Sequence, residues 1–149
     1  MRKTVLFTIV MLAAVLMGAC GATATPAPAA PAGPPALVVQ GKVGQELKLT
    51  LDDIKALGVE KLTLEHPKNG PTEYEGVRLS KVLAAAAPAA DAATLVLTAA
   101  DGFSAEVAIA DATACADCLI AISGTDLNMA MPGLSSKAWV KTVTTIEVK

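Results

Sequence analysis

The segment between residues 93 and 109 places the tightest constraint on how this chain can fold. It reads ATLVLTAADGFSAEVAI, so two apolar stretches flank the dipeptide Asp101-Gly102. Asp-Gly pairs suit the positive φ angles of a tight hairpin turn, and the residues on either side have the composition of strands. The segment therefore predicts an antiparallel β-hairpin.

Short strands and short helices are predicted on both sides of this hairpin. Apolar residues that alternate or cluster predict strands at 37–39, 47–49, 62–66 and 119–123, and one or two strands within 137–149. Three short helices are predicted, each starting at a capping residue. The first starts at Thr50, with Asp53 three residues later, and ends at Gly58; the second starts at Ser80 and ends at Pro88. The third starts at Asp111 and continues through Cys115 and Cys118. Residues 67–76 and 123–136 are predicted to be loops. The pattern indicates one α+β domain over residues 37–149.

The N-terminus has the features of a bacterial export signal. Arg2 and Lys3 precede an apolar run over residues 5–17, and two small residues then lead to Cys20. We interpret residues 1–19 as a signal peptide, too short to span a membrane. The cysteine after small residues resembles a lipobox, which implies cleavage before Cys20 and its lipidation; a plain secretory signal with a chance cysteine is the alternative. Several acyl chains on one residue give stable anchoring.

A tether is predicted between the anchor and the domain. Residues 20–36 begin with Cys20 and continue as GATATPAPAAPAGPPA, which has no periodicity and cannot form a core. We therefore expect the domain to be held on an extracytoplasmic membrane face of a bacterial cell envelope, with the membrane as its partner through the lipid.

Composition argues against nucleic-acid binding. The formal net charge is −2, and it becomes −4 when the two cations Arg2 and Lys3 are removed with the signal. The chain has one tryptophan, one tyrosine and two phenylalanines, too few for a base-stacking platform, and it shows no basic stripe.

The order of the segments resembles a known family. The segments are LTLDDIKAL, YEGVRLSKVL, LVLTAADGFSAEVAI and WVKTVTTIEV, with Tyr74, Gly76, Val77 and Leu79 in the second, Asp101, Gly102 and Phe103 in the third, and Trp139, Val140 and Lys141 in the last. This arrangement is similar to the molybdopterin-binding domain of the sulfite oxidase family. The resemblance implies a mixed, β-rich α+β fold with short helices over residues 37–149.

The chain departs from that family at the metal. In catalytic members a cysteine before the Tyr/Trp-x-Gly-Val segment ligates molybdenum, whereas Glu65 and His66 stand near that position here. Only Arg78 remains as a mature arginine, although a pterin phosphate needs several donors, and the loop before Trp139 is short. We therefore expect a reduced, stand-alone member that has lost the metal ligand and holds no cofactor; a retained molybdopterin is the alternative.

Cys115 and Cys118 form a C-x-x-C pair with several possible roles. Haem attachment requires histidine where Leu119 stands, and a structural zinc site requires four ligands. A thioredoxin-like dithiol would have a different order of elements. In an oxidising compartment, a structural disulfide, unpaired thiols, and a redox or metal role remain open.

Two further groups are candidate metal ligands. His66 is the only histidine, and Glu65, Glu73 and Glu75 lie near it in the sequence. Such residues suit a cation site, although a solvated loop histidine beside a charged strand edge gives the same pattern. Met129 and Met131 lie in a predicted exposed loop, and thioethers bind Cu(I); alternatively they pack that loop onto the core.

Three functions are compatible with these features. The leading hypothesis is a non-catalytic module on a membrane anchor that binds a small ligand or a protein partner. The second is an oxidoreductase or electron-transfer accessory that retains molybdopterin or uses Cys115 and Cys118. The third is a copper carrier that uses Met129, Met131 and His66.

Overall fold

The computed structural model describes residues 33–149, so the predicted signal peptide, Cys20 and most of the predicted tether lie outside the described residues. The elements are β1 (Leu37–Gly41), β2 (Leu47–Leu49), α1 (Leu51–Ala56), β3 (Glu60–His66), β4 (Gly70–Arg78), α2 (Leu79–Ala86), β5 (Thr94–Ala99), β6 (Ser104–Ala108), α3 (Ile109–Ala114), β7 (Leu119–Ser123), β8 (Asp126–Ala130), the 3-10 turn η1 (Ser136–Ala138) and β9 (Val143–Val148). None of the helices in residues 33–149 has the length and apolar character of a membrane span.

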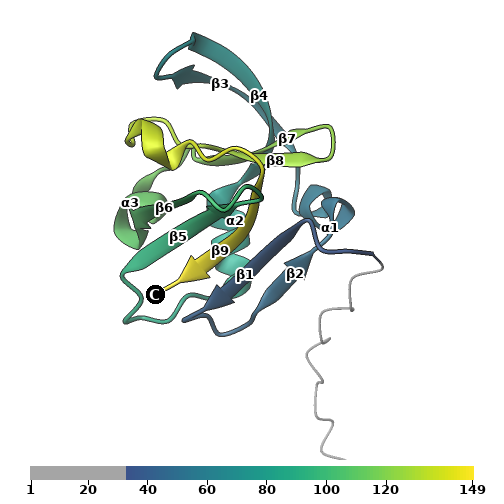
Figure 1. The fold of residues 1–149 in the computed structure, drawn as a ribbon, viewed down its shortest axis with the longest axis vertical. Coiled ribbons are helices and arrows are strands. Elements are labelled where there is room, and N and C mark those ends of the chain that lie inside the picture. Colours follow the sequence, from purple (N-terminus) through teal and green to yellow (C-terminus); the bar gives the residue numbers. More distant parts are fainter. Residues whose placement is uncertain (1–32) are drawn as a thin grey trace, which may run out of the picture.

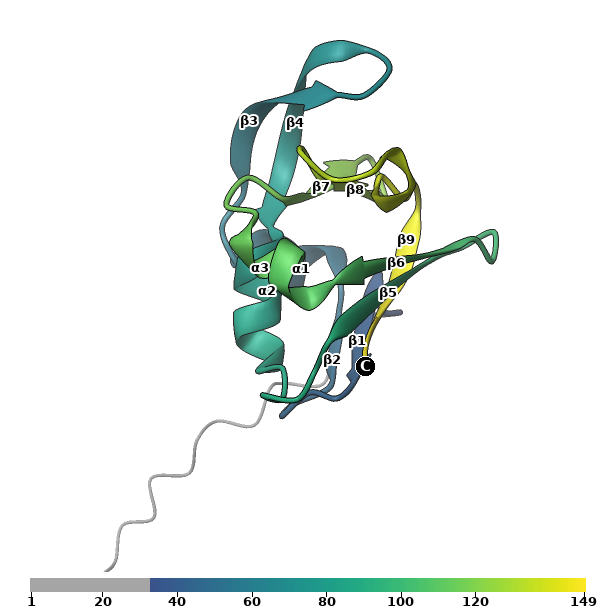
Figure 2. The same ribbon diagram turned by 90° about the vertical axis from the view of Figure 1, so that its left-hand side faces the viewer.

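The strands form two sheets, shown in Figure 1. The five-stranded sheet has the order β2-β1-β9-β5-β6, with β1 and β9 parallel and all other neighbours antiparallel. The four-stranded sheet, β3-β4-β7-β8, is antiparallel throughout. Figure 2 shows α2 beside the larger sheet, and the β3–β4 hairpin projecting from the far end of the smaller one. The predicted mixed, β-rich class is confirmed.

The hairpin predicted around Asp101-Gly102 is present as β5 and β6. Their pairing runs from Thr94 opposite Ala108 to Thr98 opposite Ser104. The connection is longer than a two-residue turn, and only Gly102 has a positive φ, of 85°. Asp101 contributes through its side chain instead, which accepts a hydrogen bond from the backbone N–H of Phe103 at 2.9 Å.

The first helix begins as predicted. The Thr50 hydroxyl accepts a hydrogen bond from the Asp53 backbone N–H, and the Asp53 carboxylate accepts one from the Thr50 backbone N–H. This reciprocal capping box satisfies two donors that the first helical turn would otherwise leave unpaired.

The predicted starts of the other two helices are wrong. α2 begins at Leu79 after Arg78, so Ser80 lies inside the helix and is not its cap. α3 begins after Ala108, and it ends before Cys115, so the cysteines follow the helix. In both cases a strand runs directly into the helix, and no polar capping residue separates the two elements.

The two predicted loops both contain strands. Only residues 67–69 form a turn, because β4 begins at Gly70 and pairs with β3 along its whole length. In the second loop, β8 pairs with β7 across a two-residue turn between Ser123 and Asp126. Cross-strand pairing satisfies the backbone of these polar segments, an effect that the local sequence does not show.

One large apolar cluster holds the sheets and helices together. The inner face of α2 contributes Leu79, Val82, Leu83 and Ala86, all buried. A smaller cluster lies beneath the β3–β4 hairpin, where Leu64 packs on Leu119, Ala121 and Ala130 of β7 and β8. Leu62, Tyr74 and Trp139 cover this second cluster, and they bring the hairpin close to the C-terminal segment.

Gly76 determines how closely β4 approaches β7. A Cβ at this position would lie 2.1 Å from the Ile120 carbonyl oxygen and 2.7 Å from the Ala121 Cα. Both obstacles are backbone atoms of the neighbouring strand, which cannot rotate away. The glycine of the Tyr-x-Gly-Val segment is therefore required for space.

We predict that Gly76→Ala destabilises the fold by about 1–3 kcal/mol, because β4 must move away from β7. Urea unfolding followed by circular dichroism measures this change. Gly33→Ala is the matched control, since a Cβ there meets nothing within 4 Å. An unchanged midpoint for Gly76→Ala would contradict the close approach described above.

Candidate functional site

A pocket of about 600 Å³ opens between the turn of the β3–β4 hairpin, the tip of the β5–β6 hairpin and the segment before β9. Its lining residues are His66, Pro67, Lys68, Asn69, Tyr74, Phe103, Ser136, Lys137, Trp139 and Lys141. Three separate parts of the chain meet there, and this volume lies within the range of small-molecule sites. The pocket is the strongest candidate functional site among the described residues.

Aromatic side chains form one wall of the pocket. The ring of Trp139 contacts the His66 ring edge-on, with centroids 4.8 Å apart, and lies 5.8 Å from the Tyr74 ring. Such edge-on and tilted contacts are favourable geometries for aromatic rings. Phe103 reaches the pocket from the tip of the β5–β6 hairpin, and 49% of its surface is exposed.

Residues 136–142, here called the strap, carry Trp139 into the pocket. Lys137, Trp139 and Lys141 line the cavity, whereas the intervening Ala138 and Val140 are buried in the main core. The alternation means that burying the apolar residues on one side directs the two lysines and the tryptophan to the other.

Hydrogen bonds from two hairpins hold the strap. The Val140 carbonyl accepts a hydrogen bond from the Met129 N–H at 2.7 Å. The Thr142 N–H donates to the Asn128 side-chain oxygen at 2.9 Å, and its carbonyl accepts from the Ala100 N–H at 2.9 Å. Thr142 has a φ of +47°, which is unfavourable for a β-branched residue, so this anchoring is made at a conformational cost.

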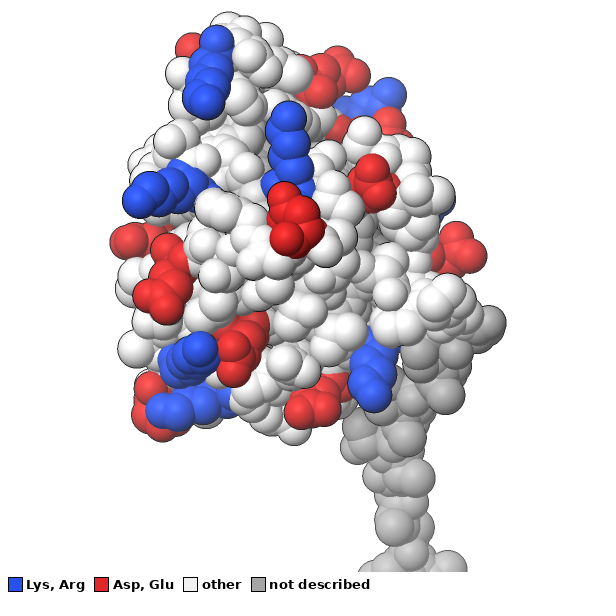
Figure 3. Space-filling model, in the orientation of Figure 1, with Lys and Arg blue, Asp and Glu red and all other residues white. Residues whose placement is uncertain are grey.

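The pocket is positively charged. Of the nine lysines in residues 33–149, four form ion pairs (Lys42, Lys61, Lys81 and Lys149), which leaves Lys48, Lys55, Lys68, Lys137 and Lys141. Three of these five unpaired lysines line the pocket, and no aspartate or glutamate does. Elsewhere charges of both signs are interspersed, as the face drawn in Figure 3 shows. The pocket therefore favours negatively charged ligands.

One donor at the site has no protein partner. The indole Nε1 of Trp139 is buried and forms no hydrogen bond with any described residue. A buried unpaired donor costs free energy, and such costs are tolerated most often at functional sites. The strap thus contains both an unpaired donor and, three residues later, the strained Thr142.

His66 lies in the pocket, at the end of β3. Its Nδ1 accepts hydrogen bonds from the backbone N–H groups of Lys68 and Asn69, at 3.1 and 3.2 Å, and these bonds shape the hairpin turn. Glu65, Glu73 and Glu75 are exposed and do not line the pocket. The fold therefore does not place these carboxylates with His66 in the pocket, as the predicted cation site would require.

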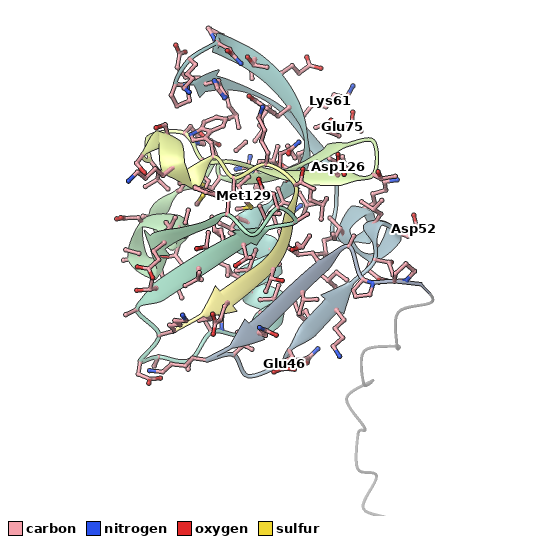
Figure 4. All side chains as sticks on the ribbon, viewed as in Figure 1. Glu46, Asp52, Lys61, Glu75, Asp126 and Met129 are labelled. Carbon is pink, nitrogen blue, oxygen red and sulfur yellow. A yellow bond between two sulfur atoms is a disulfide. The ribbon has the colours of Figure 1, made fainter. Side chains whose placement is uncertain are left out.

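The methionines are not in an exposed loop, and that expectation is wrong. Met129 belongs to β8 and Met131 follows it, with exposures of 2% and 0%. Figure 4 shows Met129 in the interior, away from the labelled charged residues at the periphery. Both thioethers pack in the main core, because β8 turns these positions inward.

Cys115 and Cys118 form a disulfide, with an S–S distance of 2.09 Å. Cys118 is fully buried in the core, and Cys115 is half-buried beside it. The bond links the end of α3 to the start of β7, the strand that pairs with β4. The disulfide therefore joins α3 to the smaller sheet, a position suited to a structural role.

Arg78 holds the short loop between the two cysteines. Its guanidinium donates to the Ala116 carbonyl and lies 3.3 Å from the Asp117 carboxylate. Glu60 binds the other side of Arg78 at 2.7 Å and also accepts from Lys81 at 3.0 Å. Two hydrogen bonds lower the pKa of the Glu60 carboxyl below its ordinary value, and the one from Arg78 has a larger effect than the one from Lys81. Arg78 is thereby committed to the disulfide loop and does not line the pocket.

No cysteine is among the residues that line the pocket. Both cysteines of the described chain are bonded to each other, and neither lines the pocket, so no thiolate is available there. Nor do residues 33–149 contain a group of three His, Cys, Asp or Glu side chains that could hold a metal ion. The lysines and aromatic rings suit an organic anion, but the donor set does not fit a thiolate-bound metal centre.

Comparison with known proteins gives the class of the chain. The model of the family described as "Oxidoreductase molybdopterin binding domain" matches residues 26–149. The chain therefore belongs to this family, and the resemblance seen in its sequence is confirmed. No curated protein matches the chain.

A solved structure shares the fold. The chain is similar to the sulfane dehydrogenase SoxCD from Paracoccus pantotrophus, with a TM-score of 0.64 and 18% sequence identity. The similarity covers 75% of this chain but only 37% of the SoxCD chain, so this protein corresponds to a part of that relative. At this identity the comparison establishes the fold alone.

We predict that the disulfide contributes about 2 kcal/mol of stability, as the chain-entropy model gives for a ring this short. Cys115→Ala/Cys118→Ala should lower the free energy of unfolding by about that amount, measured by urea denaturation. Wild-type protein unfolded in the presence of a strong reductant provides the comparison. If neither reduction nor the double substitution moves the midpoint, the bond has no structural role.

Thr142→Gly should stabilise the fold by about 1 kcal/mol, because glycine adopts the positive φ without strain. Thermal unfolding followed by circular dichroism measures the effect. Thr145→Gly in β9 is the control and should be destabilising by about 0.5–1 kcal/mol, since its backbone is extended. Equal losses for both variants would show that Thr142 is not strained.

Proposed function

We propose that this protein is a non-catalytic binding module on a membrane anchor, and that the pocket above is its ligand site. The observation that carries the proposal is the lining of the pocket, which combines lysines and aromatic rings but contains no sulfur or carboxylate ligand. Binding requires only such a lining, whereas the family's metal chemistry requires a thiolate that the described residues do not offer.

The location is part of the same proposal. The basic N-terminus, the apolar run and Cys20 support export and lipidation, and the Pro/Ala-rich residues up to 36 support a tether. A disulfide between Cys115 and Cys118 is consistent with an oxidising compartment. A domain held in this way meets its ligand outside the cytoplasm.

The two other functions have less support. A redox role for the cysteines has only their pairing to support it, since Cys118 is fully buried and neither cysteine lines the pocket. A copper site made by Met129 and Met131 would require the core to open, since both side chains are buried. For a molybdenum oxidoreductase, the pocket offers no cysteine to the metal.

The test uses the full-length protein, made in a bacterium that synthesises molybdenum cofactor and extracted in mild detergent. We expect an intact mass that begins at a lipidated Cys20 and is two hydrogens below the reduced chain. Metal analysis should find molybdenum far below one atom per chain. Stoichiometric molybdenum would contradict the proposed binding function, and an unlipidated mature N-terminus would contradict the anchor.

A further inference from the structure

We propose that His66 is a pH-sensitive positioning residue, whose neutral ring holds the turn of the β3–β4 hairpin in place and whose protonation releases that turn. This role goes beyond the proposed function, because it concerns one wall of the pocket and holds whatever the pocket binds. The wall is then ordered at neutral pH and loses its shape in mild acid.

Two hydrogen bonds carry this role. The His66 Nδ1 accepts from the backbone N–H groups of Lys68 and Asn69, at 3.1 and 3.2 Å. The Asn69 N–H also lies 3.3 Å from the His66 carbonyl oxygen, which closes the turn over residues 66–69. Aspartate, asparagine and serine are usual at the first position of such a turn, because their side-chain oxygens accept hydrogen bonds from nearby backbone N–H groups. In this chain an imidazole nitrogen has that task.

Only a neutral imidazole can accept these two bonds. A ring nitrogen carries either a lone pair or a proton, and in the imidazolium ion both nitrogens are donors. After protonation, the Nδ1–H of His66 would face two backbone N–H groups, so contacts between donors replace both hydrogen bonds. Histidine side chains ordinarily titrate between about pH 5 and pH 8. The turn therefore depends on pH in a range where asparagine at this position would not.

The pocket contains no counter-charge for an imidazolium ion. The titratable side chains that share the cavity with His66 come from the turn, β4 and the strap, and they are Lys68, Tyr74, Lys137 and Lys141. Phe103, from the β5–β6 hairpin, is uncharged. Glu65, next to His66 in the sequence, and Asp101, at the tip of the β5–β6 hairpin, do not line the pocket. Protonation of His66 thus adds a positive charge to a cavity that already holds three lysines.

Release of the turn affects two walls of the pocket. Lys68 belongs to the turn itself and is the pocket lysine that lies outside the strap. The His66 ring also contacts the Trp139 ring of the strap, with centroids 4.8 Å apart. When the two hydrogen bonds are lost, the position of Lys68 is no longer fixed and the packing against the indole ring changes.

The test is a pH titration of the isotope-labelled full-length protein in mild detergent, followed by NMR spectroscopy from about pH 8 to about pH 5. The ring of His66, the only histidine of the chain, and the amides of Lys68 and Asn69 are recorded together. The amides of Thr63 and Glu73, which pair across the same hairpin, are the reference.

We expect the Lys68 and Asn69 amides to shift with the same midpoint as the His66 ring. Their protection from hydrogen exchange, relative to an unstructured chain at the same pH, should fall about fivefold, as expected for the loss of a hydrogen bond. The reference amides should keep their shifts and their protection, because the strands of the hairpin remain paired.

Two variants separate the acceptor from the ring. His66→Asn retains a side-chain acceptor but has no ring, so the turn amides should stay in their bonded positions throughout the pH range. His66→Phe retains a ring but has no acceptor, so the same amides should lack this protection at every pH. Neither replacement side chain titrates.

Three results would overturn this role. The first is a wild-type protein whose turn amides keep their shifts and protection over the whole titration. The second is the wild-type pH response in His66→Asn, which would assign that response to another group. The third is a protected turn in His66→Phe, which would show that the acceptor is unnecessary. No ligand or metal enters these measurements, so they are independent of the molybdenum analysis that tests the proposed function.

Discussion

The close contact between β4 and β7 at Gly76 is the constraint on which the pocket depends. This contact joins the projecting β3–β4 hairpin to β7, and β7 in turn pairs with β8. The hairpin is thereby held over Trp139, so that His66 and Tyr74 reach its indole ring. If a side chain at position 76 separated the two strands, the β3–β4 turn that forms one wall of the pocket would lose its position relative to the strap.

The remaining walls are held by contacts far apart in the sequence. Asn128 of β8 and Ala100 of the β5–β6 hairpin anchor Thr142, while the disulfide and Arg78 fix the start of β7 from the opposite side. The conformational cost at Thr142 and the unpaired indole of Trp139 lie within one short segment. Local costs concentrated at a cavity are expected of a site that is shaped for binding.

Local sequence signals predicted the elements that their own residues specify. The hairpin around Gly102 and the capping box of Thr50 with Asp53 depend on neighbours within a few positions, and both formed. The starts of α2 and α3 and the two predicted loops failed, because adjoining strands and cross-strand pairing decided them. For the same reason Met129 was expected at the surface but is buried, since its direction depends on the pairing of β8.

The sequence by itself determined the family, the short α+β elements and the absence of cysteine before the Tyr-x-Gly-Val segment, because these depend on residue identity and local order. Only the tertiary structure decided that Cys115 bonds to Cys118 and that Arg78 serves that loop. It alone brought Lys68 to the same cavity as Lys137 and Lys141. Spacing along the chain does not predict such long-range contacts, because they form only when separate hairpins bury their apolar faces against a common core.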